Sequence, residues 1–300
     1  MSRDLTGTML VLLSTAGYAF FSILTKIALG MGMRPFDLAV WRFVLAAAIF
    51  WASFPFWRKW ARLSQLTRRD TITMLLLGVL FTGGALTAFF ALSTGISAST
   101  YTLLVNTSPA LVALLSVLLG DRLSLVAWGA VGMALVGSAL TLQGDLGGAG
   151  WGALLLPILN AIFIAVYVAL AARFTRHIPG ITTGIFVISG ALITLLVFSV
   201  LWGIQLPPPG AWWPVLGIAI FGTVVGIAAL LAGMNYIPAY RASLIQSAGP
   251  PATLILAALI LGDHLTVIQL MGGALILASV VLVSVIERRM TTPVSGAPLS

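Results

Sequence analysis

Ten long apolar segments separated by short connectors fill almost the whole chain, and they restrict the folds that the chain can adopt. A helix needs about 20 apolar residues to cross the hydrocarbon core of a bilayer. The strands of a membrane barrel are about ten residues long and alternate in polarity, so continuous runs of this length predict an all-α integral membrane protein. We expect ten transmembrane helices at residues 8–28, 38–57, 72–92, 99–119, 123–142, 151–171, 182–202, 212–232, 240–261 and 266–286.

The composition excludes several classes of protein. Of 300 residues, 60% are hydrophobic and 7% are charged, whereas soluble chains carry about 25% charged residues. A soluble enzyme is therefore excluded, and the formal net charge of +8 is explained by basic membrane loops rather than by nucleic-acid binding. The chain has no cysteine and two histidines, so we expect no cofactor, metal cluster or thiolate catalysis.

The placement of lysine and arginine predicts the orientation. If the N-terminus is cytoplasmic, the inner segments hold twelve of these residues and the outer segments hold two, Lys26 and Arg34, while Arg42 falls within the second span. Cytoplasmic loops are enriched in positive charge. We therefore expect a multi-pass protein of the inner (plasma) membrane with both termini in the cytoplasm.

The two halves of the chain repeat one another. Leu119-Gly-Asp-Arg-Leu123 recurs as Leu261-Gly-Asp-His-Leu265, and Pro109 and Pro251 stand at the same offset. In each copy of this turn, glycine permits the helix to stop and aspartate can cap the next helix.

Each half contains five spans, and because five is odd the second copy is inverted relative to the first. We expect two inverted five-helix repeats, arranged as a basket around a central cavity. The predicted divisions are residues 1–142 for the first repeat, 150–286 for the second, and 287–300 for a disordered cytoplasmic tail.

Several motifs resemble the drug/metabolite transporter superfamily, specifically its ten-span EamA family. They are Trp41-Arg42-Phe43 in the second span, Pro109 in the fourth, the short turn before the fifth, and Leu265-Thr-Val-Ile-Gln-Leu-Met-Gly272 at the start of the tenth. The family usually has glutamate where Asp121 and Asp263 stand. The resemblance implies export of small metabolites across the inner membrane, and among the members it is greatest to the amino-acid exporters of the YddG type.

Intramembrane polar residues are the candidates for substrate contact, because polar groups are expensive in a bilayer unless they face the interior of the helix bundle. The spans with the most such groups are the fourth and ninth, and equivalent positions in the first and sixth are added. The candidate substrate-binding residues are Tyr18, Ser22, Trp41, Arg42, Ser99, Tyr101, Thr102, Asn106, Asn160, Tyr167, Ser243, Gln246 and Ser247.

Each candidate also has a structural interpretation. Serine and threonine in membrane helices often bond to their own backbone, tyrosines can belong to the interfacial belt, and Arg42 can extend to the headgroups. The glycine pairs Gly222/Gly226, Gly129/Gly132 and Gly272/Gly273 favour close helix packing. We expect a monomer, with a homodimer through the fifth and tenth spans as the alternative.

The acidic residues narrow the mechanism. All seven, Asp4, Asp37, Asp70, Asp121, Asp145, Asp263 and Glu287, fall at span ends or in connectors. A transporter of hydrophobic cations, or a proton antiporter with a buried glutamate, needs a carboxylate at mid-membrane. The sequence therefore favours a non-enzymatic exporter of small polar metabolites, amino acids foremost, that works by alternating access. The alternatives are an exporter of other organic anions or drug-like metabolites, a membrane-embedded enzyme, and a non-transporting subunit.

Overall fold

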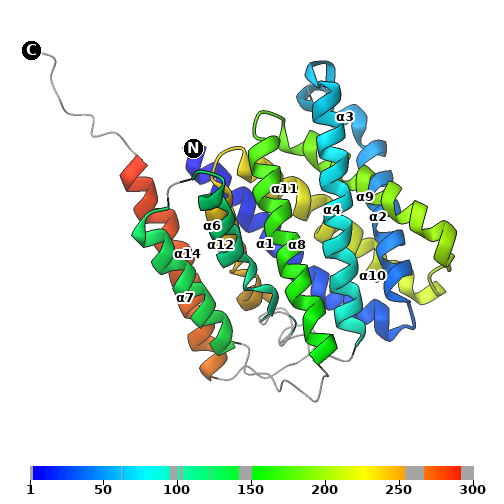
Figure 1. The fold of residues 1–300 in the computed structure, drawn as a ribbon. Coiled ribbons are helices and arrows are strands. Elements are labelled where there is room, and N and C mark those ends of the chain that lie inside the picture. Colours follow the sequence, from blue (N-terminus) through cyan, green and yellow to red (C-terminus); the bar gives the residue numbers. More distant parts are fainter. Residues whose placement is uncertain are drawn as a thin grey trace, which may run out of the picture.

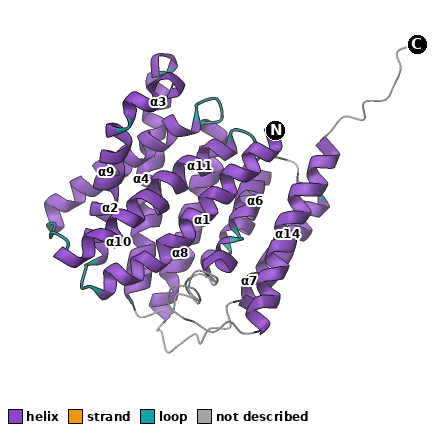
Figure 2. Cartoon of the chain, turned by 180° about the vertical axis from the view of Figure 1, so that it is seen from behind, coloured by secondary structure: helices purple, strands orange, loops and turns teal. Residues whose placement is uncertain are grey.

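The computed structural model describes residues 3–61, 63–94, 101, 104–121, 123–141, 151–253 and 267–291. Within these ranges the chain is helical and contains no strand (Figures 1 and 2), which confirms the predicted all-α class. Six helical stretches are long and apolar enough to cross a membrane, and three more apolar helices are shorter, at Ser108–Leu118, Leu125–Leu140 and Leu270–Leu282.

The helices of the first half begin where the sequence supplies capping residues. Pro35 opens the second helix, and Thr67 and Asp70 form a capping box at the start of the fourth; such residues satisfy or remove the free backbone N–H groups of a first turn. The elements are α1 (Arg3–Gly30), α2 (Pro35–Ala52), α3 (Phe54–Ala61), η1 (Leu63–Gln65), α4 (Arg68–Ser93), α6 (Ser108–Leu118) and α7 (Leu125–Thr141).

The second half contains one irregular span. Its elements are α8 (Trp151–Phe174), α9 (Gly180–Trp202), η2 (Pro209–Ala211), α10 (Trp212–Gly217), η3 (Ile218–Val225), α11 (Gly226–Met234), α12 (Ala239–Gln246) and α14 (Val267–Thr291). The segment η3 is a π-helix, continuous with α10 before it and α11 after it. The predicted eighth span therefore crosses the bundle as an α-helix, a π-helix and a second α-helix.

The predicted second span ends earlier than expected. The sequence predicted a helix to Trp57, but α2 stops at Ala52, the chain turns at Ser53, and α3 begins at Phe54. The cause is Pro55, because a proline inside a helix lacks the N–H for the ladder and its ring clashes with the preceding turn. In the second position of α3 the same proline is well tolerated.

The predicted fourth and ninth spans are broken near their prolines, which corrects the expectation of one continuous helix in each. Asn106 and Thr107 form a turn directly before α6, and Ser247 and Ala248 form a turn directly after α12. Helix resumes at Ser108–Pro109 in the first case and at residues 249–253 in the second. Residues 254–266, with the rest of the ninth span, lie outside the described residues.

The helices of the two halves pack in matching pairs. Helix α1 packs on η3 and α11 as α8 packs on α4, while α2 packs on both η3 and α9, and α9 also packs on α4. Helices α7 and α14 lie side by side at one edge of the molecule in both views (Figures 1 and 2). The chain thus forms a bundle in which each half contributes helices to both sides of the centre.

Glycines allow the closest of these crossings, but not all at the predicted places. A Cβ on Gly222 would lie 3.0 Å from Phe21 Cβ, and one on Gly137 would lie 2.8 Å from the carbonyl oxygen of Gly272. Around Gly129 and Gly132 nothing lies within 4 Å of such a Cβ. Within the described residues, therefore, no other segment of the chain packs on this pair.

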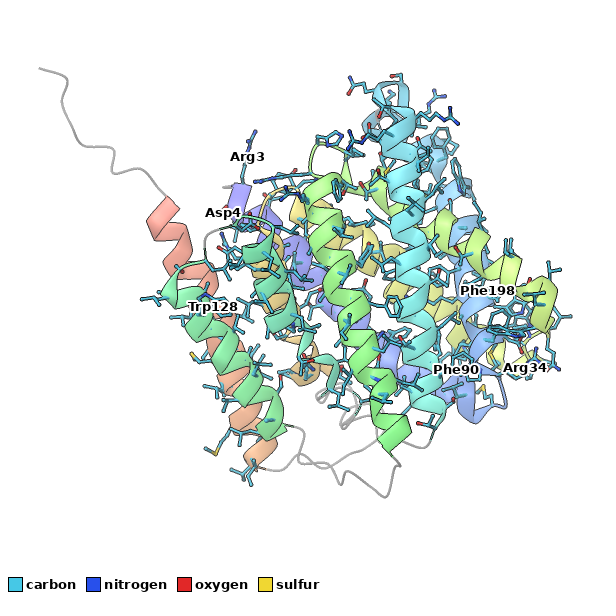
Figure 3. The ribbon with its side chains drawn as sticks, in the orientation of Figure 1. Arg3, Asp4, Arg34, Phe90, Trp128 and Phe198 are labelled. Carbon is cyan, nitrogen blue, oxygen red and sulfur yellow. The ribbon has the colours of Figure 1, made fainter. Side chains whose placement is uncertain are left out.

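The outer surface and the ends of the bundle agree with a membrane setting. Large apolar side chains such as Leu125 and Val200 are 90% and 85% exposed, as expected where lipid replaces water. Arg3 and Arg34 lie at opposite ends of the bundle (Figure 3), and the last turns of α14 lie at the same end as Arg3 (Figure 1). We refer to the two ends as the Arg3 end and the Arg34 end.

Candidate functional site

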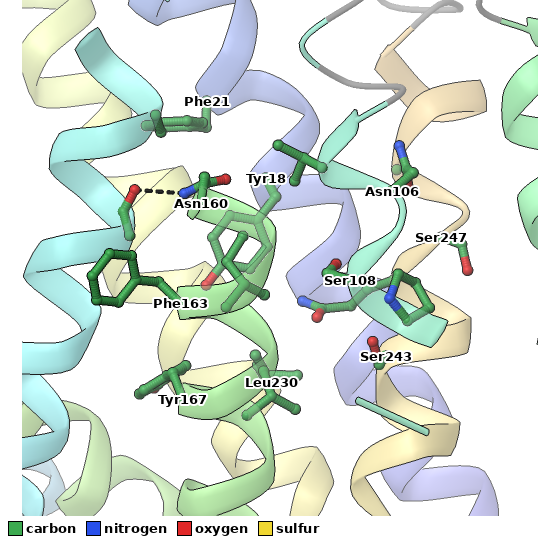
Figure 4. A pocket seen from close by; sticks show the side chains of 18 of the residues that line it. Tyr18, Phe21, Asn106, Ser108, Asn160, Phe163, Tyr167, Leu230, Ser243 and Ser247 are labelled. Carbon is green, nitrogen blue, oxygen red and sulfur yellow. Dashed lines mark hydrogen bonds between the residues drawn. The ribbon is translucent and has the colours of Figure 1, made fainter. Parts of the chain in front are cut away.

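A cavity of about 210 Å³ lies in the middle of the bundle, between α1, α2, α4, α6, α8, α11 and α12. Its described lining combines aromatic rings, small residues and uncharged polar side chains with one charged residue, Arg42. Figure 4 shows Phe163 and Tyr167 of α8 on the side of α4, and Ser108, Ser243 and Ser247 across the view beside α6 and α12, with Tyr18 of α1 between the two groups. The cavity therefore has an aromatic wall and a hydroxyl-rich wall.

The aromatic wall is continuous because small residues let the helices approach. The Phe81 and Tyr167 ring centroids are 5.0 Å apart, a distance typical of favourable aromatic pairs. Next to them, a Cβ on Gly83 would lie 2.6 Å from Cε1 of Phe163. A larger residue at position 83 would push the Phe163 ring, which lines the cavity.

Arg42 is buried in the wall formed by α2, with 3% of its surface exposed. Its Nε donates to Thr223 Oγ1 at 2.6 Å and its Nη2 donates to the Gly222 carbonyl at 3.2 Å. The guanidinium carbon lies 4.7 Å from the centroid of Phe21 and 6.0 Å from that of Phe81. Such contacts lower the cost of a buried cation through charge-assisted hydrogen bonds and cation–π attraction.

The π-helix η3 supplies the Arg42 partners. Thr223 Oγ1 also donates to the Ile218 carbonyl, five residues earlier, at 3.1 Å. A π-helix bonds each residue to the fifth one along instead of the fourth, so its carbonyls are displaced from their α-helical positions. Short π segments are frequent at functional sites. Here the segment places the Gly222 carbonyl and the Thr223 hydroxyl beside the guanidinium.

Asn160 is fully engaged by its neighbours. Its Nδ2 donates to the Gly84 carbonyl at 2.5 Å and to Thr87 Oγ1 at 3.4 Å, and its Oδ1 accepts from the Tyr101 hydroxyl at 3.2 Å. These bonds link α8 to α4 and to Tyr101, and Figure 4 draws a bond from Asn160 to the side of α4. Asn160 lines the cavity, but its amide group serves the structure of the wall.

The wall of the broken spans is less completely bonded. Gln246 Nε2 donates to Ser14 Oγ at 3.4 Å, and Ser247 Oγ donates to the Leu244 carbonyl at 2.5 Å. Ser243 is 3% exposed, and no side-chain hydrogen bond joins it to the residues that the structure describes. This wall offers hydroxyl and amide groups to an occupant of the cavity.

The Tyr167 hydroxyl has no hydrogen-bond partner among the described residues. The residue is 2% exposed, and its oxygen is buried without a hydrogen bond to any described residue. Most buried polar groups are satisfied, and leaving one unsatisfied costs about 1–3 kcal/mol. The residue lines the cavity, but its oxygen is enclosed by protein atoms, so a ligand reaches it only when neighbouring side chains move.

The structure brings nine of the thirteen predicted site residues to the cavity: Tyr18, Arg42, Tyr101, Asn106, Asn160, Tyr167, Ser243, Gln246 and Ser247. Ser99 and Thr102 lie outside the described residues, as does the side chain of Ser22. Trp41 is not part of the described lining. The sequence reasoning missed Phe21, Phe81 and Phe163, since it counted only polar groups and their helical spacing alone did not tell a cavity face from a lipid face.

Trp41 belongs to a clamp at the Arg34 end. Its Nε1 donates to the Gln205 carbonyl at 2.8 Å, and the Gln205 N–H donates to Asp37 at 3.1 Å. Asp37 also accepts two hydrogen bonds from Arg34, at 2.5 and 2.8 Å, and these bonds raise the pKa of Arg34 above its usual value. We call Arg34, Asp37, Trp41 and Gln205 the α2 clamp; it joins α2 to the connector between α9 and α10.

The Arg3 end has a matching contact and a second hollow. His177, just before α9, lies 3.2 Å from Asp70 at the start of α4, so the beginning of α9 is joined to the other half as the beginning of α2 is. A hollow of about 350 Å³ lies one turn beyond the cavity along α8 and α12, lined by Asp121, Arg173, Arg176 and Tyr240 among others.

Comparison with known proteins gives one family and a shared fold. The model of the EamA-like transporter family matches residues 5–143 and again residues 150–285. The uncharacterized transporter YcbK of Bacillus subtilis is 27% identical over 295 residues, which is 89% of this chain and 88% of that protein. The uncharacterized transporter sll1319 of Synechocystis sp. is 32% identical over 178 residues, 56% of this chain and 52% of that protein. A solved crystal structure superposes with a TM-score of 0.75 at 18% identity, covering 95% of this chain and 99% of the other.

Proposed function

Because the chain belongs to the EamA-like transporter family of the drug/metabolite transporter superfamily, we propose that it exports small polar metabolites, amino acids foremost, by alternating access. The observation that carries this proposal is the central cavity, in which aromatic rings face serine and amide side chains around one buried arginine. A solute with an apolar body and a carboxylate fits such a lining, because rings bury the body while N–H and O–H groups bind the oxygens.

Two features support alternating access. The paired packing of the two halves matches an inverted repeat of residues 1–142 and 150–286, which supplies two equivalent gates. The α2 clamp at one end and the Asp70–His177 contact at the other join corresponding parts of those halves. Opening one end requires its contact to break while the other holds.

We propose that the protein lies in the inner (plasma) membrane with its Arg3 end in the cytoplasm. Cations of the Arg3 end include Arg58, Lys59, Arg68 and Arg69, as the positive-inside rule requires. The hollow with Arg173 and Arg176 then faces the cytoplasmic metabolites. A cysteine at Ser64 should react with an impermeant maleimide only from the cytoplasm, and one at Leu206 only from outside; labelling of both from one side contradicts this orientation.

The second candidate function is export of organic anions that are not amino acids. The observation that favours it is Arg42, which lines the cavity without an ion pair to any carboxylate of the described residues. Both candidates require binding and release without covalent chemistry, and we propose that a monomer suffices for either.

The test is transport by the purified full-length chain in liposomes. We expect labelled solute to exchange into vesicles preloaded with the same unlabelled solute, at rates above those of protein-free vesicles, for carboxylate-bearing metabolites and not for sugars or polyamines. The Gln246→Leu variant should reduce exchange while remaining monodisperse, because a similarly sized apolar side chain removes hydrogen-bonding capacity without opening a void. Absence of exchange for every carboxylate in the panel would refute the proposed function.

A further inference from the structure

The charge of the cavity is unbalanced. Among its described lining residues there is no aspartate, glutamate, lysine or histidine, and Arg42 is the one charged group. Within the described ranges, salt bridges join Arg34 to Asp37 and Arg241 to Asp4, and Asp70 contacts His177, so no carboxylate there is paired with Arg42. The site as described therefore carries one positive charge.

Arg42 has donors to spare. A guanidinium has five N–H groups, and two of them are used in the bonds to Thr223 and Gly222. The other three have no partner within the described part of the chain. A carboxylate accepts two parallel N–H bonds from a guanidinium, and this pairing is among the strongest in proteins. The surroundings hold Arg42 in place and leave its capacity for such a partner open.

A second, independent observation points to a ligand with acceptor oxygens. Tyr18 lines the cavity, and its hydroxyl makes no side-chain hydrogen bond to a described residue. The Tyr167 hydroxyl, which is enclosed by protein atoms, has no partner among the described residues either. A phenol donates one hydrogen bond, and a bound anion is the occupant that gains most from such donors.

An ammonium group finds no carboxylate among the described lining residues. A zwitterionic amino acid can place its carboxylate at Arg42, but its ammonium is then left without a counter-ion from the described lining. Removing such a charge from water without a counter-ion costs several kcal/mol. A cationic solute lacks the carboxylate and is repelled by Arg42, whereas a monoanion leaves a neutral complex.

We infer that the cavity selects small monoanionic carboxylates with an apolar or aromatic body over zwitterionic amino acids, and excludes cations, with Arg42 as the residue that sets this order. This inference rests on the proposed transport function and specifies the substrate class of the same site. It places organic anions that are not amino acids ahead of amino acids, which is the reverse of the order given under the proposed function.

Three compounds with the same phenyl skeleton test the inference: 3-phenylpropionate, phenylalanine and phenethylamine, which are an anion, a zwitterion and a cation at neutral pH. Binding is measured as the shift in thermal unfolding of the detergent-solubilised full chain, and transport as liposome exchange above protein-free vesicles. We expect 3-phenylpropionate to half-saturate at a concentration at least ten-fold below that of phenylalanine, and phenethylamine to give no signal.

Substitutions test whether Arg42 sets the order of affinities for the anion and the zwitterion. Arg42→Gln should bring the anion and the zwitterion within about three-fold of each other, a residual difference near 0.7 kcal/mol, and Arg42→Lys should keep the anion first at lower affinity. Lys26→Gln is the matched control, since it removes an equal charge from an exposed residue outside the described lining and should leave the order unchanged. Thr223→Val removes one partner of Arg42 but not its charge, and should also preserve the order.

The outcomes separate the two proposals. Tighter binding of phenylalanine than of 3-phenylpropionate by the wild-type chain overturns the inference while leaving an amino-acid exporter intact. An anion that stabilises the wild-type chain but is never exchanged refutes transport and supports the anion site. If Arg42→Gln does not fold, the wild-type order and the Arg42→Lys variant decide; retention of the full order in a folded Arg42→Gln variant overturns the assignment to Arg42.

Discussion

Replacement of Gly78 by alanine should disrupt the crossing of α4 and α9 on which the aromatic wall depends. A Cβ at position 78 would lie 2.7 Å from the Ala191 nitrogen and 2.8 Å from the Gly190 Cα, and closer still to the Val187 carbonyl oxygen. All three are backbone atoms of α9, so no side chain can rotate away. Ordinary carbon contacts are about 3.5–4.0 Å, and the two helices must therefore separate by about 1 Å.

The expected loss in the free energy of unfolding follows from this separation of α4 and α9. A gap of about 1 Å forfeits up to about half of the dispersion attraction of each pair of atoms that faces it, and overpacked sites in well-packed proteins lose about 1–3 kcal/mol. Because backbone cannot yield locally, we expect a loss of about 2–3 kcal/mol in the free energy of unfolding. For a chain of this size that lowers the midpoint of thermal unfolding by about 4–8 °C.

A matched control separates this contact from the general effect of adding a methyl group. Gly132 lies in α7, and a Cβ there meets nothing within 4 Å. Gly132→Ala should therefore raise the midpoint slightly, since alanine is the better helix former by up to about 1 kcal/mol. Both variants are compared in the same detergent by thermal unfolding. If Gly78→Ala unfolds at or above the wild-type midpoint, α4 and α9 do not cross as closely as described, and the cavity wall that they support is misplaced.

Three further substitutions or conditions test the site. Tyr167→Phe should raise the free energy of unfolding by about 1 kcal/mol, because it removes an unsatisfied buried hydroxyl; a lower unfolding midpoint would mean that the hydroxyl has a partner within the protein. Asn160→Leu should lower the free energy of unfolding by about 2 kcal/mol, because the Tyr101 hydroxyl loses its acceptor, and thermal unfolding at the wild-type midpoint would show that the amide is not a structural link. A pH jump across the liposome membrane should leave the initial exchange rate nearly unchanged for a carboxylate that stays ionised over the pH range used, since the described lining holds no carboxylate or histidine. Accumulation that requires a proton gradient would reveal a titrating group on the path.

The membrane class and the positions of most helices could be predicted from the sequence, because both follow from the length of apolar runs. The helix ends depended on single residues instead. Pro55 ended the second span five residues early, and the prolines after Asn106 and Ser247 broke the fourth and ninth spans. The π-helix at Ile218–Val225 had no sequence signal, and neither did its contact with Arg42, which joins residues 181 positions apart in the chain.

The cavity could be predicted in part. Polar residues inside long apolar spans were rare enough for most of the candidates to reach it, and Arg42 was among them. Trp41 was placed at the site through its neighbour Arg42, but adjacent residues of a helix point about 100° apart, and the indole instead bonds to Gln205. Gly129 and Gly132 mark a smooth helix face in the sequence, but their spacing does not show what covers it, and no described segment of the chain does.

The property that the sequence could not reveal at all is which polar groups remain available. Asn160 and Tyr167 are both buried polar residues of α8 that line the same cavity, and from the sequence they are equivalent candidates. The structure separates them, because the amide of Asn160 is held by three neighbours while the hydroxyl of Tyr167 has none among the described residues. Because a ligand gains most from accessible donors and acceptors that the protein itself has not satisfied, recognition should depend on the unused N–H groups of Arg42 more than on Asn160. The chemistry of the substrate is thus set by what the folding of the bundle leaves unpaired.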